Sequence, residues 1–263
     1  MVVLILERGL SSRLRLVDSR EAYRRLNSFL YRFSKMYSVR FVGRKKLSPY
    51  ILYSTQSYLE SDKLGFVLYS MLYQGYNAPV IVVRGYGGRL YIVDGHHRAM
   101  ASLWTRRLVD SYLVEALGYK PRVYCRLVDT HVINPPVDPG EPYRTLKHMV
   151  NIIWFLGERH KARALVWRET IPIARLYATQ PIPGYKTIQT TSQQWIPPLI
   201  YNYKNKYYVL DGHKRVCSLL LKGYDVVDSI VFTLGVKIGV IDTTARLENP
   251  VFDKNYCLQE ENI

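Results

Sequence analysis

Two segments of the chain carry the same short run of acidic, small and basic residues. Residues 91–98 read Tyr-Ile-Val-Asp-Gly-His-His-Arg, and residues 208–215 read Tyr-Val-Leu-Asp-Gly-His-Lys-Arg. In both, an apolar stretch typical of a buried strand leads into a polar corner at which a helix is expected to begin. Backbone N–H groups, a flexible glycine and several donor side chains then surround one point, which is the chemistry of an anion-binding site.

Each residue of the first corner has an expected role. Asp94 is suited to cap the helix or to hold Mg2+, and Gly95 lets a phosphate approach the backbone. His96, His97 and Arg98 are expected to donate to phosphate oxygens, Arg98 with two bonds. A plain strand-to-helix corner, in which the arginine pairs with the aspartate, is the alternative, and the repetition favours the anion site. The candidates of the second corner are Asp211, His213, Lys214 and Arg215.

The similarity extends outward from both corners. The two aspartates are 117 residues apart (211 − 94), Leu-Tyr-Ser-Thr-Gln at 52–56 precedes the first, and Leu-Tyr-Ala-Thr-Gln at 176–180 precedes the second. An apolar segment with a proline lies between these landmarks in each copy, at 78–82 and 197–201. This order indicates an internal duplication, and it predicts an α/β protein of two tandem units.

Residue patterns place the boundaries of these units. The amphipathic pattern at 19–37 predicts a helix within a basic N-terminal extension, 1–46, and Asp18 with Glu21 predicts a capping box. The proline-rich stretch 134–142 is the expected linker. The first unit is assigned to 47–133, the second, with a helix at 143–166, to 143–240, and a tail to 241–263. Within the first unit we expect an extended segment at 47–53, a helix at 58–73, strands at 79–84 and 89–93, and a helix from 96 to about 107.

Composition restricts the class of partner. The net charge of +16 produces a field that attracts phosphate, either in nucleotides or in nucleic acid, and the 23 tyrosines offer rings on which bases can stack. No stretch approaches the roughly 20 apolar residues of a membrane span, so we expect a cytoplasmic protein with no membrane partner. Three widely separated cysteines predict neither a disulfide framework nor a zinc site, and they are interpreted as ordinary thiols.

The Val-Asp-Gly-His-His-Arg run and the order of strands and helices around it resemble the ParB/sulfiredoxin-like domain. The resemblance covers 47–115 well and 170–232 less well. Within that superfamily the motif is similar to that of archaeal free L-serine kinases, which carry the same Asp-Gly-His-His-Arg and form O-phosphoserine for cysteine biosynthesis. Sulfiredoxins place a catalytic cysteine where His96 and His213 stand, so repair of peroxiredoxin is not expected.

The resemblance implies an ATP- or ADP-dependent phosphotransferase that acts on free L-serine with Mg2+. It assigns catalysis to Asp94 and His97, and orientation of the nucleotide or serine to Gln56, with Gln180 at the matching place in the second unit. The kinases have a glutamate as general base where this chain has glutamine, and glutamine cannot accept a proton. The base is therefore expected to be Glu60, Asp62 on the same predicted helix, or a motif aspartate, with Glu60 as the first candidate.

Two further points follow from the resemblance. The residues Asp242-Thr243-Thr244 are the candidate remnant of the kinases' distal substrate-binding segment. The alternative function is that of a ParB-like nucleic-acid-binding protein without kinase activity, supported by the charge of +16. No helix-turn-helix pattern follows the first unit, which argues against DNA partition.

Overall fold

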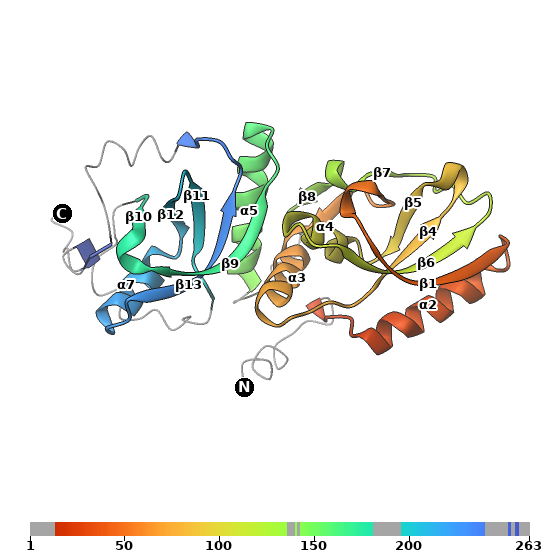
Figure 1. Cartoon of the computed structure of the whole chain (residues 1–263), viewed down its shortest axis with the longest axis horizontal. Coiled ribbons are helices and arrows are strands. Elements are labelled where there is room, and N and C mark those ends of the chain that lie inside the picture. Colours follow the sequence, from red (N-terminus) through yellow and green to blue (C-terminus); the bar gives the residue numbers. More distant parts are fainter. Residues whose placement is uncertain are drawn as a thin grey trace. The chain divides into compact units, whose positions relative to one another are not determined.

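The computed structural model describes residues 14–135, 140, 143–180, 196–239, 252–253 and 256–257. The chain divides into two compact units, residues 1–151 and 152–263, and each contains its own mixed β-sheet (Figure 1). The expected mixed α/β class is therefore confirmed. Among the described residues, no helix combines the length and the apolar character that a membrane span requires.

The first unit has a six-stranded sheet in the order β1-β6-β4-β5-β2-β7. Strands β3 and β8 form a separate parallel pair. Helix α3 packs against α4, and α5 contains the boundary between the two units. The elements are α2 (Ser19–Phe33), β1 (Val39–Leu47), β2 (Leu52–Ser54), β3 (Tyr58–Glu60), α3 (Ser61–Tyr73), β4 (Val80–Arg84), β5 (Leu90–Asp94), α4 (His96–Trp104), β6 (Val109–Ala116), β7 (Cys125–Arg126), β8 (His131–Ile133) and α5 (Tyr143–His160).

The second unit has a five-stranded sheet in the order β10-β12-β11-β13-β9. Its helix α7 follows β12 in the same way that α4 follows β5. The elements are β9 (Leu165–Pro172), β10 (Leu176–Ala178), β11 (Leu199–Tyr203), β12 (Lys206–Asp211), α7 (His213–Leu221) and β13 (Val226–Thr233).

Apart from the additional edge strand β7 of the first unit, the two sheets share one topology. Strand β6 is antiparallel to β1 and parallel to β4, as β13 is to β9 and β11. Strand β5 is antiparallel to β4 and parallel to β2, as β12 is to β11 and β10. A β-bulge occurs at the matching place, between Ile81 and Val82 and between Leu199 and Ile200. The place in the second unit that corresponds to α3 falls at 181–195, outside the described residues.

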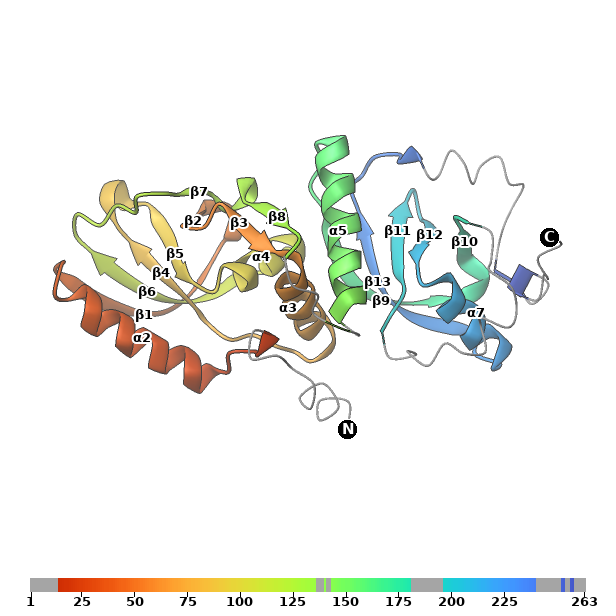
Figure 2. The same cartoon turned by 180° about the vertical axis from the view of Figure 1, so that it is seen from behind.

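The N-terminal extension proposed for 1–46 contributes directly to the first unit. Strand β1 pairs with β6 along its length, and Figures 1 and 2 show α2 running along the same two strands. The buried face of α2, with Leu26 and Phe29, packs on residues of β4 and β6 such as Ile81. The Asp18 carboxylate accepts a 2.6 Å hydrogen bond from the Glu21 N–H and so caps α2. The first unit therefore begins before residue 47, and residues 1–13 lie outside the described part.

Several expected boundaries need correction. The helix expected at 19–37 ends at Phe33, and the helix expected at 143–166 ends at His160, where Lys161 takes a positive φ of 49°. Residues 165–172 form a strand instead, because their alternating side chains pair with β13. The helix expected at 58–73 begins at Ser61, after β3. Most of the linker expected at 134–142 lies outside the described residues, namely 136–139 and 141–142.

The interpretation of all three cysteines as ordinary thiols was wrong. Cys217 in α7 and Cys257 form a disulfide across 40 residues of sequence, and both are fully buried, while Cys125 is free. The nearby Phe252 N–H donates to the Leu176 carbonyl at 3.2 Å. The two cysteines meet because the chain at Phe252 lies against the edge strand β10. A separation of 40 residues in the sequence does not predict this contact. The rest of the expected tail, apart from four residues, is outside the described part.

Candidate active site

The corner between β5 and α4 is built around a left-handed glycine. Gly95 has φ 90° and ψ 30°, and a Cβ there would lie 2.7 Å from Arg98 Nη2 and 2.7 Å from Val80 Cγ1. Glycine is required for both reasons, because other residues rarely adopt this conformation and have no room beside the guanidinium. The close approach also places the Arg98 side chain directly against the turn.

Arg98 belongs to the framework of the corner. Its Nη2 donates to Asp94 Oδ2 at 2.7 Å and its Nη1 to the Pro79 carbonyl at 2.5 Å, and the side chain is only 8% exposed. The expected two-bond contact with phosphate is therefore not available to it, since both ends of the guanidinium already hold the chain. The alternative interpretation of the motif, in which arginine pairs with aspartate, describes this residue correctly.

Asp94 neither caps α4 nor fits a magnesium ligand. No side-chain bond caps α4, and the two carboxylate oxygens of Asp94 face Arg98 Nη2 and Arg25 Nη1, the latter at 3.3 Å. Two guanidinium groups beside one carboxylate leave it a poor partner for a cation. Within the described ranges, no group of three or more His, Cys, Asp or Glu side chains is arranged to hold a metal.

The two histidines are held in the neutral form. The Thr55 N–H donates to His96 Nε2 at 3.3 Å, and the Glu60 N–H donates to His97 Nε2 at 3.1 Å. Burial lowers the pKa of each to about 4, and the Lys63 ammonium contributes at His97. Because Nε2 accepts in both rings, each ring proton lies on Nδ1. A neutral His97 ring can still donate a hydrogen bond through Nδ1, but without a positive charge.

The second corner has the same framework. Gly212 has φ 95°, and the Thr179 N–H donates to His213 Nε2 at 3.1 Å. Arg215 pairs with Asp211 at 2.5 Å and donates to the Ile196 and Pro197 carbonyls at 3.0 and 3.3 Å. Burial lowers the pKa of His213 to about 4. The repeated aspartate, glycine, histidine and arginine therefore form a structural joint that holds each strand-to-helix corner.

The second corner differs at two places. Its Gln180 amide lies 3.0 Å from His213 Nδ1, whereas Gln56 faces a cavity in the first unit. Lys214 replaces His97 and is only partly buried. Among the described residues, a second neutral histidine, His97, and a glutamine that lines a cavity are thus features of the first corner.

A polar cavity of about 540 Å3 lies against the first corner. Its floor is formed by Asp94, Gly95, His96 and His97, and Gln56 lines the same space. The surrounding positive side chains come from outside the motif: Arg15 from the segment before α2, Arg24 and Arg25 from α2, and Lys63 from α3. The cavity thus combines the turn with positive side chains, three from the N-terminal segment and one, Lys63, from α3.

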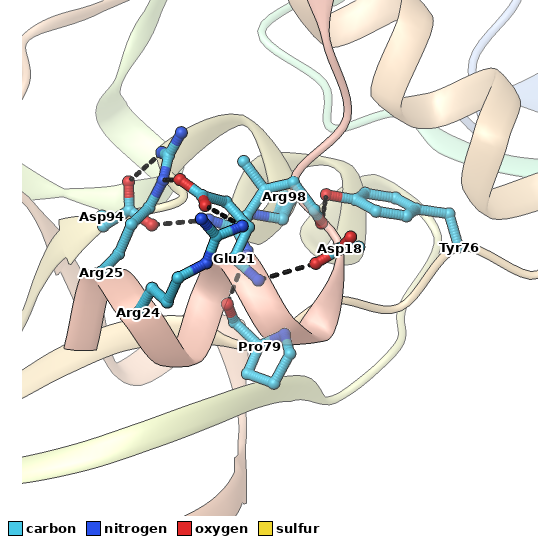
Figure 3. A network of polar contacts seen from close by, with 9 residues as sticks. Asp18, Glu21, Arg24, Arg25, Tyr76, Pro79, Asp94 and Arg98 are labelled. Atoms are coloured by element: carbon cyan, nitrogen blue, oxygen red, sulfur yellow. Dashed lines mark hydrogen bonds and ion pairs between the residues drawn. The ribbon is translucent and has the colours of Figure 1, made fainter. Parts of the chain in front are cut away.

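A chain of ion pairs connects α2 to the corner (Figure 3). Arg25 Nη1 lies 3.3 Å from Asp94 Oδ1, and Arg25 Nε lies 3.1 Å from Glu21 Oε1. Arg24 Nη2 lies 2.9 Å from the second oxygen of Glu21. One carboxylate therefore serves two arginines, and their positive charge is only partly balanced.

The expected base lies beside the cavity rather than on it. The Glu60 carboxylate forms an ion pair with the Lys63 ammonium, and its backbone N–H holds His97. Lys63 and His97 line the cavity, whereas Glu60 does not. Asp62, the second candidate base, is buried at 1% exposure. The candidate remnant at 242–244 lies outside the described residues.

Sequence reasoning missed residues that build the site. Thr55 and Thr179 orient the histidines, and both stand in the repeated Leu-Tyr-x-Thr-Gln segment, so the repeat carried a usable signal. Arg25 and Lys63 reach the corner from helices distant in sequence. In the sequence, Arg24 and Arg25 contribute only to the basic character of residues 1–46, because the direction of their side chains depends on how α2 packs.

Comparisons with known proteins leave the chain without an assigned family. No family model matches it, and no curated protein matches it. Among solved structures it is similar to protein Atu1540 from Agrobacterium tumefaciens, with 17% identity and a TM-score of 0.24 over 32% of this chain. The chain spans about half, 49%, of the length of that protein. A likeness at this level assigns neither fold nor function.

Proposed function

We propose that the first unit binds a nucleotide through its phosphates and transfers the terminal phosphoryl group to the hydroxyl of free L-serine. The observation that carries the proposal is the polar cavity of about 540 Å3 on the Asp94 corner. Its volume falls in the range of roughly 300–1,000 Å3 that is common for small-molecule sites. The serine acceptor comes from the resemblance of residues 94–98 to the archaeal kinases.

The same resemblance leads us to propose that both units are ParB/sulfiredoxin-like domains in tandem. The shared strand order, strand directions and bulge position support a common origin for the two units. Since only the first corner combines the open glutamine with two adjacent histidines, we place the reaction there. The second unit then keeps the framework without the second histidine, because Lys214 stands at the position of His97.

The chemistry at the first corner would depend on positioning and charge. The first N–H groups of α4 have no acceptor within the helix, and the His97 Nδ1–H adds a neutral donor. Lys63 contributes positive charge from α3. Donors fixed in this way stabilise the charge that spreads over the transferred phosphoryl oxygens.

The acceptor hydroxyl requires orientation more than a strong base. In a loose transition state the nucleophile loses its proton late, so full deprotonation beforehand is unnecessary. We assign Gln56 the role of holding the serine hydroxyl, because this residue lines the cavity. Glu60 acts on Lys63 and His97 as a positioning residue, rather than as the proton acceptor first expected of it.

The activity test uses the full chain with L-serine, Mg2+ and either ATP or ADP. Mass spectrometry should detect O-phosphoserine with at least one donor, and the product should fall at least tenfold in His97→Ala and Gln56→Ala. Lys214→Ala, at the matching position of the second unit, is the control and should keep full activity. Absence of O-phosphoserine with both donors would refute the serine kinase.

Nucleic-acid binding is the second candidate, because the two units repeat a cation and tyrosine pair. The Arg89 guanidinium carbon lies 5.5 Å from the Tyr53 ring centre, and Lys206 Nζ lies 5.4 Å from that of Tyr177. Both pairs join the start of the motif strand to its parallel neighbour. Such rings and cations, together with the charge of +16, are typical of surfaces that bind single strands.

A further inference from the structure

The repeated motif supplies little free positive charge to the first cavity. Arg98 is buried and its guanidinium holds Asp94 and Pro79. His96 and His97 each have a pKa of about 4 because they are buried, so they are neutral at physiological pH. The positive charge that balances an anion at this corner must therefore come from side chains outside the motif.

That positive charge lies mainly on side chains of the N-terminal segment that line the cavity. The lining contains five cationic side chains, Arg98 included, against the three carboxylates of Asp18, Glu21 and Asp94. Arg24 and Arg25 share the single carboxylate of Glu21. Arg15 is exposed and has no ion pair within the part of the chain that the structure describes. Two guanidinium groups, those of Arg15 and Arg24, are thus the most available to a ligand.

We propose that Arg15 and Arg24 supply the positive charge that binds the phosphate groups of the ligand, and that the repeated motif contributes only neutral donors beneath them. This inference rests on the proposed phosphate site in the first cavity. Arg25 acts as a positioning residue, since it joins Glu21 of α2 to Asp94 of the corner. The segment before β1, which the motif does not include, would then determine which anions bind.

The arrangement favours a linked pair of phosphates over a single one. Two guanidinium groups on separate elements, one before α2 and one within it, can each hold a different phosphate of the same chain. A cavity of about 540 Å3 has room for a diphosphate or triphosphate group with an attached nucleoside. We therefore expect inorganic pyrophosphate to bind more tightly than orthophosphate at equal ionic strength.

The test is calorimetric titration of the full chain with ATP, inorganic pyrophosphate and orthophosphate. Arg15→Ala and Arg24→Ala should each weaken ATP and pyrophosphate about tenfold or more, as expected for loss of one charge-assisted bond. Arg32→Ala removes the same charge from the last turn of α2, outside the cavity lining, and should leave both affinities unchanged. Arg24→Lys should restore only part of the affinity, because lysine lacks the planar pair of donors.

The outcomes separate this inference from the proposed function. If the wild type binds ATP and the Arg15 and Arg24 variants bind it equally well, the arginines are not ligands, although the nucleotide site stands. Equal weakening in Arg32→Ala would show a general charge effect and would also overturn the inference. If the wild type binds neither ATP nor pyrophosphate, both proposals fail. Thermal unfolding of each variant confirms that the protein titrated is folded.

Discussion

Arg98→Ala should lower stability rather than remove a ligand contact. The substitution deletes a bond to the Asp94 carboxylate at 2.7 Å and one to the Pro79 carbonyl at 2.5 Å. Bonds that involve a charged group contribute about 1.5–3 kcal/mol each. The Asp94 side chain is 27% exposed, so water replaces part of the loss, and we expect a cost near the lower end, about 3 kcal/mol. In a unit of 151 residues this lowers Tm by roughly 6–12 °C.

Urea and thermal unfolding measure this cost, with Arg215→Ala as the matched variant. Arg215 makes the same kinds of bonds in the second unit, to Asp211, Ile196 and Pro197, so its loss should cost a similar amount. Arg98→Lys should recover little, because an ammonium cannot serve both acceptors in the planar geometry. An Arg98→Ala protein with wild-type stability and lost ATP binding would refute the framework role and return Arg98 to the ligand site.

Three further predictions concern acid, reduction and salt. Burial disfavours the charged ring and so lowers the pKa of His96 and of His213 from the ordinary value of 6.5 to about 4 in the folded protein. Between pH 4 and pH 6.5 the unfolded chain therefore binds more protons than the folded chain. The free energy of unfolding is full above about pH 6.5 and decreases toward pH 4, by at most roughly 1.4 kcal/mol per pH unit for each histidine. Urea unfolding at pH 7.5 and pH 5.0 measures this decrease, which should be smaller in His213→Gln than in the wild type. Reduction of the Cys217–Cys257 disulfide should destabilise the chain by about 4 kcal/mol, since it opens a loop of 40 residues, and equal melting of oxidised and reduced protein would contradict this. If the tyrosine and cation pairs bind single-stranded RNA, affinity should fall steeply with salt and should weaken in Tyr53→Ala and Arg89→Ala, while absence of binding at low salt excludes that function.

The repeat is recognisable in the sequence because its glycine, arginine and aspartate residues are required by the fold of each corner. Gly95 and Gly212 are required by positive φ and by the arginine beside them, and the arginines pair with the aspartates four residues earlier. These constraints act within a few residues of sequence, so a pattern of residue types records them. The same locality explains why the motif predicted the strand and the helix around each corner.

The parts that sequence reasoning missed depend on contacts between distant segments. Arg25 reaches Asp94 across 69 residues, and Cys217 reaches Cys257 across 40. Neither pairing can be predicted from periodicity. The first requires α2 to pack on the sheet, and the second requires the chain at Phe252 to lie against β10. The role predicted for Arg98 was wrong for a different reason. A basic residue beside a turn of the phosphate-binding type was interpreted as a ligand contact, whereas its guanidinium stabilises the fold through Asp94 and Pro79.

A structure of the full chain with a non-hydrolysable ATP analogue would show directly where the nucleotide binds. We expect phosphate density in the first unit, between the Asp94–His97 corner and Arg15 and Arg24, with the matching corner at Asp211 empty. Phosphates bound at the Asp211 corner, or no bound nucleotide at concentrations well above those that saturate nucleotide sites, would contradict it.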